Sequence, residues 1–244
     1  MDFKGKRIAC LGDSITEGAY TPVGERYFDV LSGMLGAEVK SFGKNGAQTR
    51  DLFSQLDAVK AELSEDVDLI MVFIGTNDFY GNVPLGEWFT EELHEVVRTR
   101  DEQGAPAELS TRRVRSFSYD MGTFKGRLNS FLTELRRSYP TKEIALLTPI
   151  HRAFATFGPK NIQYDELHSN DIGIFFEEYV AAVRQAADLY SLRLCDLYRD
   201  SGLFPLEDGN AKTYFSNTER DRLHPNKFGH ARIGRVLAGY LSAW

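Results

Sequence analysis

The sequence has no long apolar run. No stretch of its 244 residues approaches the roughly 18 apolar residues that a helix needs to cross a bilayer, so no membrane span is expected. The first residues, MDFKGKRIACLGDS, enter a strand-like pattern at once and contain no apolar signal region with a cleavage site. We therefore expect a cytoplasmic protein that has no membrane partner.

Cysteine and clustered basic residues are also scarce. The two cysteines, Cys10 and Cys195, each lie within an apolar strand-like run, which is typical of buried thiols rather than of a disulfide or a metal pair. Lysine and arginine total 29 against 35 aspartate and glutamate, a net charge of -6, and the basic residues are scattered apart from a run at 112–115. A nucleic-acid partner is not expected.

Three familiar motifs are missing as well. The sequence contains no G-x-S-x-G nucleophile elbow, no P-loop and no G-x-G-x-x-G dinucleotide fingerprint. This absence argues against an elbow-type α/β-hydrolase and against nucleotide binding by either of the two glycine-rich loops.

What the sequence does contain is an alternation of strand-like and helical patterns. Five short apolar runs predict strands that are covered on both faces: residues 7–12, 38–42, 69–75, 143–149 and 192–197. Amphipathic stretches between them predict helices: residues 25–35, 50–63, 123–139, 174–189 and 226–241. The alternation predicts an α/β fold with a doubly wound parallel sheet.

The length and the hydrophobic content of 42% suffice for a full core, and we expect one domain, 1–244. Two segments, at about 79–122 and 153–173, are longer than ordinary connections and count as insertions. We expect the first to fold partly as helix and partly as loop. It would serve either as a lid or as an interface in a homo-oligomer.

Residues that follow the strand-like runs are candidate site residues, because ligands of such sheets bind beyond the carboxyl ends of the strands. Ser14 follows the first run, although a serine there is by itself more simply a helix N-cap. His224 precedes the last helical pattern, and Asp221, three residues earlier on the same loop, can orient its ring. A serine, a base and an orienting carboxylate form the set that ester hydrolysis requires.

Gly46 and Asn77 would complete such a site. A glycine offers a backbone amide free of Cβ obstruction, and an asparagine at a strand end offers a side-chain amide, so both can donate to a developing oxyanion. Taken singly, Gly46 is more simply a turn glycine and Asn77 a strand-end cap.

Four sequence blocks occur in order: RIACLGDSITEG, FGKNGAQT, VFIGTNDF and DRLHPNKFGH. Together they resemble the signature blocks of the SGNH (GDSL-type) hydrolase family, and they span residues 7–230. The Gly-Asp-Ser triplet alone is a weak signal, but its combination with Gly-Thr-Asn-Asp and a late Asp-x-x-His-Pro is a strong one.

The resemblance implies a role for each of these positions. Ser14 would be the nucleophile and, through its own amide, one oxyanion donor, with Gly46 and Asn77 as the other two. His224 would be the base and Asp221 its orienting acid. The resemblance also implies a flavodoxin-like three-layer α/β/α sandwich with strand order 2-1-3-4-5, and no cofactor or metal.

One departure from the family pattern concerns the second block. Ser41 stands where the family usually has asparagine, and Lys44 and Asn45 make the middle of the block bulkier. Asp13, Asn45 and His151 are the candidates for substrate contact. For His151, which follows the fourth strand, a hydrogen bond within its loop is the alternative.

The remaining histidines carry less information. Asp165, Glu166, His168 and Asp171 invite a metal interpretation, but they do not meet a metal-ligand spacing, and a solvated loop is the simpler interpretation. His230 is expected to pack at the start of the final helix.

We therefore expect a serine esterase that removes short acyl groups, such as acetyl, from a sugar or another polar alcohol, because the insertions are polar and carry tyrosine and arginine. Lysophospholipid or thioester hydrolysis is the alternative. A flavodoxin-like FMN-binding protein is a non-enzyme alternative, but Asp13 and Glu17 would repel a phosphate in the first loop. The remaining alternative is a catalytically idle carbohydrate-binding or scaffolding domain of the same fold.

Overall fold

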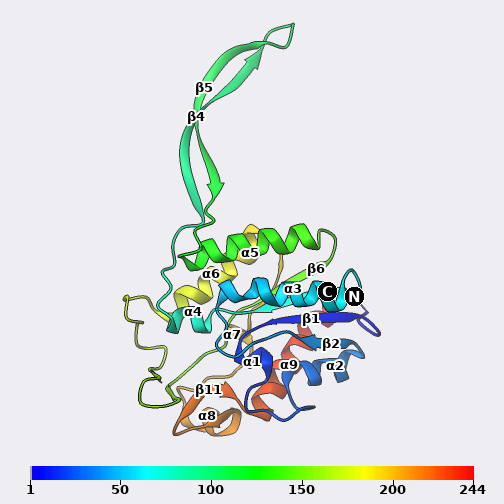
Figure 1. Ribbon diagram of the computed structural model, residues 1–244, viewed down its shortest axis with the longest axis vertical. Coiled ribbons are helices and arrows are strands. Elements are labelled where there is room, and N and C mark those ends of the chain that lie inside the picture. The colour runs from blue at the N-terminus through cyan, green and yellow to red at the C-terminus, as the bar shows by residue number, and fades with distance from the viewer. Residues whose placement is uncertain (1) are drawn as a thin grey trace.

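The structure, a computed structural model, describes residues 2–244 and has a parallel five-stranded sheet at its centre (Figure 1). The strands are β1 (Arg7–Gly12), β2 (Glu38–Ser41), β3 (Leu69–Phe73), β6 (Glu143–Leu147) and β9 (Arg193–Cys195). Their order is β2-β1-β3-β6-β9. Counted within this sheet, that is the predicted order 2-1-3-4-5, and the strands match the predicted runs to within two residues.

Helices cover both faces of the sheet. The long ones are α2 (Tyr27–Leu35), α3 (Leu52–Leu63), α5 (Phe124–Ser138), α6 (Phe176–Leu189) and α9 (Lys227–Ser242). Helices α3, α5 and α6 lie on one face, and α2 and α9 lie on the other (Figure 1). Side chains of β1 alternate between the two layers, since Ala9 and Leu11 pack with the first set and Ile8 and Cys10 with the second. The predicted three-layer sandwich is confirmed.

Shorter elements occupy the connections. They are α1 (Ser14–Glu17), α4 (Thr76–Tyr80), α7 (Leu197–Asp200), α8 (Asp208–Tyr214) and a 3-10 helix, Thr49–Asp51. A second, antiparallel sheet has the order β10-β11-β7-β8, with β10 (Phe215–Asn217), β11 (Asp221–Pro225), β7 (Ala155–Thr156) and β8 (Ile162–Gln163). The expectation that Asp221 and His224 lie on a loop was therefore wrong. Their strand is short and pairs with the distant Ala155, and no local pattern reveals such a pairing.

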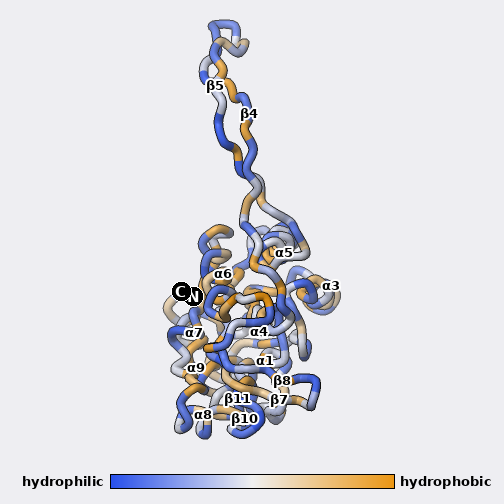
Figure 2. Tube along the Cα trace, turned by 90° about the vertical axis from the view of Figure 1, so that its left-hand side faces the viewer, coloured by the Kyte–Doolittle hydropathy of each residue, from blue (hydrophilic) through white to orange (hydrophobic). Residues whose placement is uncertain are grey.

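The insertion at 79–122 holds a long β-hairpin, β4 (Phe89–Arg100) and β5 (Pro106–Phe117), whose strands pair only with each other. It stands away from the body of the molecule (Figures 1 and 2). The expectation of helix and loop was wrong here. Most of the hairpin's side chains are exposed on both faces, so its strands lack the apolar face by which a strand is usually recognised.

The structure shows where the two cysteines lie and whether any described helix could span a membrane. Cys10 and Cys195 are buried free thiols, as predicted, and burial raises the pKa of each to about 12. Neither thiol is therefore nucleophilic near neutral pH. None of the helices in residues 2–244 combines the length and the apolar content that a bilayer span requires.

Candidate active site

Three of the predicted site residues meet in a buried chain of hydrogen bonds. Ser14 Oγ lies 2.8 Å from His224 Nε2, and His224 Nδ1 lies 2.9 Å from Asp221 Oδ2. The second oxygen of Asp221 accepts hydrogen bonds from the backbone N–H groups of Leu223 and His224, both at 3.0 Å. A carboxylate on Nδ1 favours the tautomer in which Nε2 is free to accept the serine proton.

Ser14 is positioned by the end of β1. Asp13 caps helix α1 by accepting a hydrogen bond from the Ile15 N–H at 3.0 Å, which makes Ser14 the first helical residue. The first N–H groups of a helix have no acceptor within it, so the Ser14 amide is available to a ligand. Gln55 of α3 donates to the Gly12 carbonyl and accepts from the Gly12 N–H, both at 2.8 Å. These two bonds fix the strand end directly before the nucleophile.

Gln55 was missed in the sequence, although a signal existed. It is fully buried and follows Leu52 by three residues on the apolar stripe of its helix. A polar residue on such a stripe has to find hydrogen-bond partners inside the protein.

His224 is held by β11 and by the residues that follow it. Asn226 caps helix α9 by accepting from the Phe228 N–H at 2.8 Å, and its own side chain donates to the Phe215 carbonyl on β10 at 3.0 Å. The aromatic rings of Tyr20 and Phe157 lie edge-on to the imidazole, at centroid distances of 5.2 and 5.5 Å. These two residues come from unrelated loops, and nothing in their local sequence indicated the contact.

Gly46 and Asn77 line the same cavity as Ser14. Gly46 adopts a left-handed backbone conformation with φ of +74°, which a glycine tolerates and other residues rarely do. Within residues 2–244 its N–H donates to no other group. Asn77 Nδ2 donates to the Ala47 carbonyl at 3.1 Å, which leaves its second hydrogen for a ligand. The arrangement brings both predicted amide donors to the serine.

A buried ion pair braces the loop that carries Gly46. Asp78 accepts from the Thr49 N–H at 2.9 Å and from the Thr49 hydroxyl at 3.0 Å, and its other oxygen accepts from Arg127 Nη1 at 3.0 Å. Burial raises the pKa of Asp78 to about 6, although Thr49 and Arg127 favour its ionised form. Burial likewise raises the pKa of Asp13 to about 6. Two carboxyl groups that are costly to ionise therefore lie behind the site.

The cavity at Ser14 has a volume of about 410 Å³. Its walls combine aromatic rings, amide side chains and one leucine. The rings are those of Tyr20, Tyr80 and Phe157, the amides those of Asn45, Gln48, Asn77, Asn161 and Gln163, and the leucine is Leu223. A second cavity of about 320 Å³ shares Tyr80 and Gln163 with it and continues toward Asn82 and Asn170. The two cavities adjoin, and polar and apolar surface contribute about equally to their walls.

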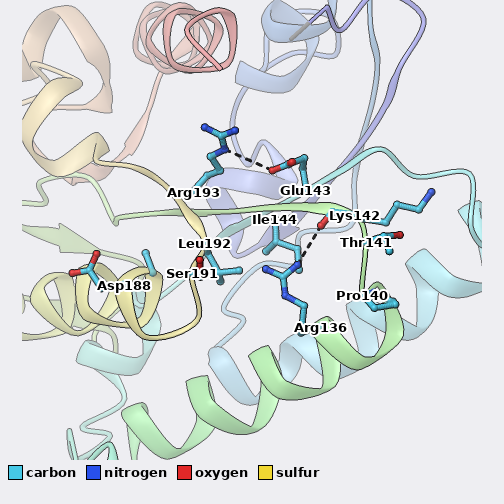
Figure 3. Close-up of a pocket in the computed structure, with 11 residues that line it drawn as sticks. Arg136, Pro140, Thr141, Lys142, Glu143, Ile144, Asp188, Ser191, Leu192 and Arg193 are labelled. Carbon is cyan, nitrogen blue, oxygen red and sulfur yellow. Dashed lines mark hydrogen bonds and ion pairs between the residues drawn. The ribbon is translucent and has the colours of Figure 1, made fainter.

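A third and larger cavity, of about 600 Å³, lies at the opposite edge of the sheet (Figure 3). It surrounds the first residues of β6 and β9, Glu143 and Arg193, which form an ion pair at 3.6 Å. Its lining includes Ser191 and Thr141 but no histidine that could act as a base. Unlike this cavity, the one at Ser14 holds a serine in contact with a histidine.

The three candidates for substrate contact are placed differently. Asn45 lines the Ser14 cavity, whereas Asp13 turns back onto the Ile15 amide and is not part of the lining. His151 Nδ1 lies 2.5 Å from Glu166 Oε1, outside this lining, so the alternative of a hydrogen bond within the structure applies. Of the three candidates, Asn45 alone lines the Ser14 cavity among the residues that the structure describes.

The acidic segment that follows β8 does not form a metal site in the described part of the chain. No three histidine, cysteine, aspartate or glutamate side chains in residues 2–244 are grouped so that they could hold a metal ion. Asp165 pairs with His168 at 2.8 Å on the surface, while Glu166 is buried against His151. His230 is buried near the start of α9, as predicted, and its Nδ1 accepts from the Tyr27 N–H at 3.2 Å.

The chain matches a protein-family model, a curated protein and several solved structures. Residues 10–232 match the model of the GDSL-like Lipase/Acylhydrolase family. An acetylxylan esterase of Xylanibacter ruminicola is 25% identical over 246 residues, which cover 95% of this chain and 42% of the relative. The chain thus spans less than half the length of that curated relative.

Solved structures show the same fold. A protein from Lactobacillus plantarum is 28% identical, with a TM-score of 0.73 and 98% of each chain covered. An acetyl xylan esterase, AlAXEase, is 18% identical, with a TM-score of 0.58, and the match covers 97% of this chain and 98% of the other. At that identity the second likeness concerns the fold alone.

Proposed function

Because the chain belongs to the GDSL-like lipase/acylhydrolase family, we propose that it is a carboxylic ester hydrolase in which Ser14, His224 and Asp221 act as a catalytic triad. The observation that carries the proposal is the unbroken chain of contacts at 2.8 and 2.9 Å from the serine hydroxyl to the carboxylate. The FMN-binding alternative leaves this chain of contacts without a role.

The first half-reaction is attack by Ser14 Oγ on the ester carbonyl carbon. Its proton passes to His224 Nε2, and Asp221 stabilises the imidazolium that results. The carbonyl oxygen becomes an oxyanion, for which the N–H groups of Ser14 and Gly46 and the Asn77 side chain are the donors. When the tetrahedral intermediate collapses, the alkoxide leaves with the proton from His224, and the acyl group stays on Ser14.

The second half-reaction repeats these roles with water. His224, neutral again, takes a proton from a water molecule, whose oxygen attacks the acyl carbon. Collapse of the second intermediate returns the proton to Ser14 Oγ and releases the carboxylic acid. His224 has to be neutral for both attacks.

The walls of the cavity favour a small acyl group on a polar alcohol. About 410 Å³ lined by Asn45, Gln48, Asn161 and Gln163 suits an acetyl group with part of a sugar ring better than a long acyl chain. The adjoining cavity, whose lining includes Asn82 and Asn170, would accommodate more of the alcohol. Similarity to an acetylxylan esterase supports acetylated carbohydrate as the substrate class. A lysophospholipase or thioesterase would need a longer apolar surface.

The test is the turnover of p-nitrophenyl acetate by Ser14→Ala. Loss of the nucleophile should abolish turnover while the thermal melt stays that of a folded protein. Ser54→Ala, an exposed serine on α3, is the matched control and should retain full activity. Full turnover by Ser14→Ala would reject the triad.

The substrate class needs a separate panel. Acetylated mono- and oligosaccharides are compared with p-nitrophenyl esters of increasing chain length. The proposal expects kcat/KM to be highest for the acetylated sugars and to fall as the acyl chain grows. A preference for long acyl chains would instead favour the lipid-hydrolase alternative.

A further inference from the structure

The β4–β5 hairpin, called the arm from here on, is unusually isolated for a secondary-structure element. Each strand has 12 residues, and their only strand partner is each other. A two-stranded ribbon is at best marginally stable in water, and both of its outer edges present unpaired backbone N–H and C=O groups. Figures 1 and 2 show it projecting from the body beyond α5. Such a ribbon gains stability by pairing with another strand.

The base of the arm is firmly anchored. Asn129 of α5, which is fully buried, donates to the Trp88 carbonyl at 2.9 Å and to the Ser118 carbonyl at 2.8 Å, and so ties the two ends together. Phe117 stacks on Tyr190 with ring centroids 5.2 Å apart. No residue of the arm lines the Ser14 cavity. These contacts describe a fixed projection and not a lid.

Charges are distributed unevenly along each strand of the arm. In β4 the acids Glu91, Glu92 and Glu95 lie near the base, and Arg98 and Arg100 lie near the tip. In β5 the charges are reversed: the acid, Glu108, lies near the tip, and arginines 112, 113 and 115 lie near the base. Acids and arginines nearly balance over residues 89–117, which does not suit nucleic acid.

An apolar patch lies between the charged halves. Val97 pairs with Leu109 across the strands and forms this patch with it. Leu93 lies on the same face nearer the base, within the acidic half of β4. Their exposed fractions are 39%, 55% and 71% for Val97, Leu109 and Leu93. Exposed apolar side chains grouped at the middle of a charged ribbon are typical of a protein interface.

We propose that the arm pairs with the arm of a second copy of this chain, so that the two β4 strands lie side by side and antiparallel. In this arrangement the acidic base half of one β4 meets the basic tip half of the other, and the apolar patches come together near the two-fold axis. The contact is isologous and closes as a dimer. It also covers an exposed strand edge in each copy.

The test uses two charge variants of the full chain and the mass in solution by size exclusion with light scattering. Glu92→Arg with Glu95→Arg leaves Glu91, which is paired with Arg115 of β5, as the last acid of β4. Arg98→Glu with Arg100→Glu leaves β4 with acids and no arginine. Each variant alone should dissociate roughly tenfold or more readily than the original chain, because like charges then face each other. An equimolar mixture of the two should recover the dimer.

Lys4→Glu with Lys212→Glu is the matched control, since both lysines are exposed, lie outside the arm and change the net charge as much as the second variant does. It should remain a dimer of twice 27.6 kDa, and a thermal melt should show every variant to be folded. The proposal is overturned if the original chain is a monomer at 100 µM (roughly a hundred times a Kd of about 1 µM). It is also overturned if either arm variant stays dimeric, or if the mixture stays monomeric. Antiparallel packing of β4 on the partner's β5 predicts that last result, because it sets the acids of β4 against the arginines of a β5 strand that both variants leave unchanged.

Discussion

Removal of the Asn77 side chain should isolate the contribution of one oxyanion donor. In Asn77→Ala, Ser14, His224 and Asp221 keep their contacts, because none of them bonds to Asn77. Only one amide donor to the intermediate is lost, and loss of such a donor costs on the order of 10² to 10³ in kcat, or about 3–4 kcal/mol. KM should change little, since the oxyanion exists only in the intermediate and in the transition states that flank it.

The variant also loses the hydrogen bond of 3.1 Å from Asn77 to the Ala47 carbonyl, which tethers the loop of Gly46. Asn45→Ala controls for the loss of an amide from the same cavity, and it should keep kcat within about threefold of the original chain, because Asn45 is not an oxyanion donor. The assay is steady-state turnover of p-nitrophenyl acetate with a thermal melt beside it. A folded Asn77→Ala protein with unchanged kcat, or with a loss that lies in KM alone, would refute the assigned role.

Three further predictions concern buried polar groups. Asp221→Asn should lower kcat by up to about 10⁴ through the wrong histidine tautomer, and retention of most of the turnover would contradict the triad. Asp13→Asn should stabilise the fold by up to about 3 kcal/mol at pH 8, because burial raises the pKa of Asp13 to about 6 and makes its ionisation costly. This gain in the free energy of unfolding should shrink as the pH falls through 6 toward 4. Chemical denaturation at several pH values measures it, and a gain that is the same at pH 8 and pH 4 would contradict the prediction. Asn129→Leu should destabilise the fold by about 2–5 kcal/mol, since the carbonyls of Trp88 and Ser118 lose their donor; an unchanged melting temperature would show that the base of the arm is held by other contacts.

The sheet and its covering helices could be predicted from the sequence because they depend on local periodicity. The buried strands β1 and β3 have near-continuous apolar runs, and helices such as α5 repeat their apolar residues at intervals of three and four. The identities of Ser14, His224 and Asp221 came from their motifs. The rule that the carboxyl ends of parallel strands share one edge accounts for the place of Ser14, which follows β1, but not for His224 and Asp221, which lie on β11 of the antiparallel sheet.

What could not be predicted depends on contacts between distant segments. Strand β11 exists because it pairs with β10 and with Ala155, and none of these residues forms an apolar alternation. Tyr20 and Phe157 flank His224 from separate loops. The arm was misjudged because its strands face water on both sides, where polar and charged residues hide the two-residue period.

The distance in sequence between Ser14 and His224, 210 residues, has a consequence for the timing of activity. During synthesis the proposed nucleophile is made 210 residues before the proposed general base. Throughout that interval Ser14 is an ordinary alcohol that cannot acylate itself on cellular esters. Under the proposed mechanism, ester hydrolysis begins only after β11 has docked beside Ser14, so turnover reports that these two distant segments have folded together.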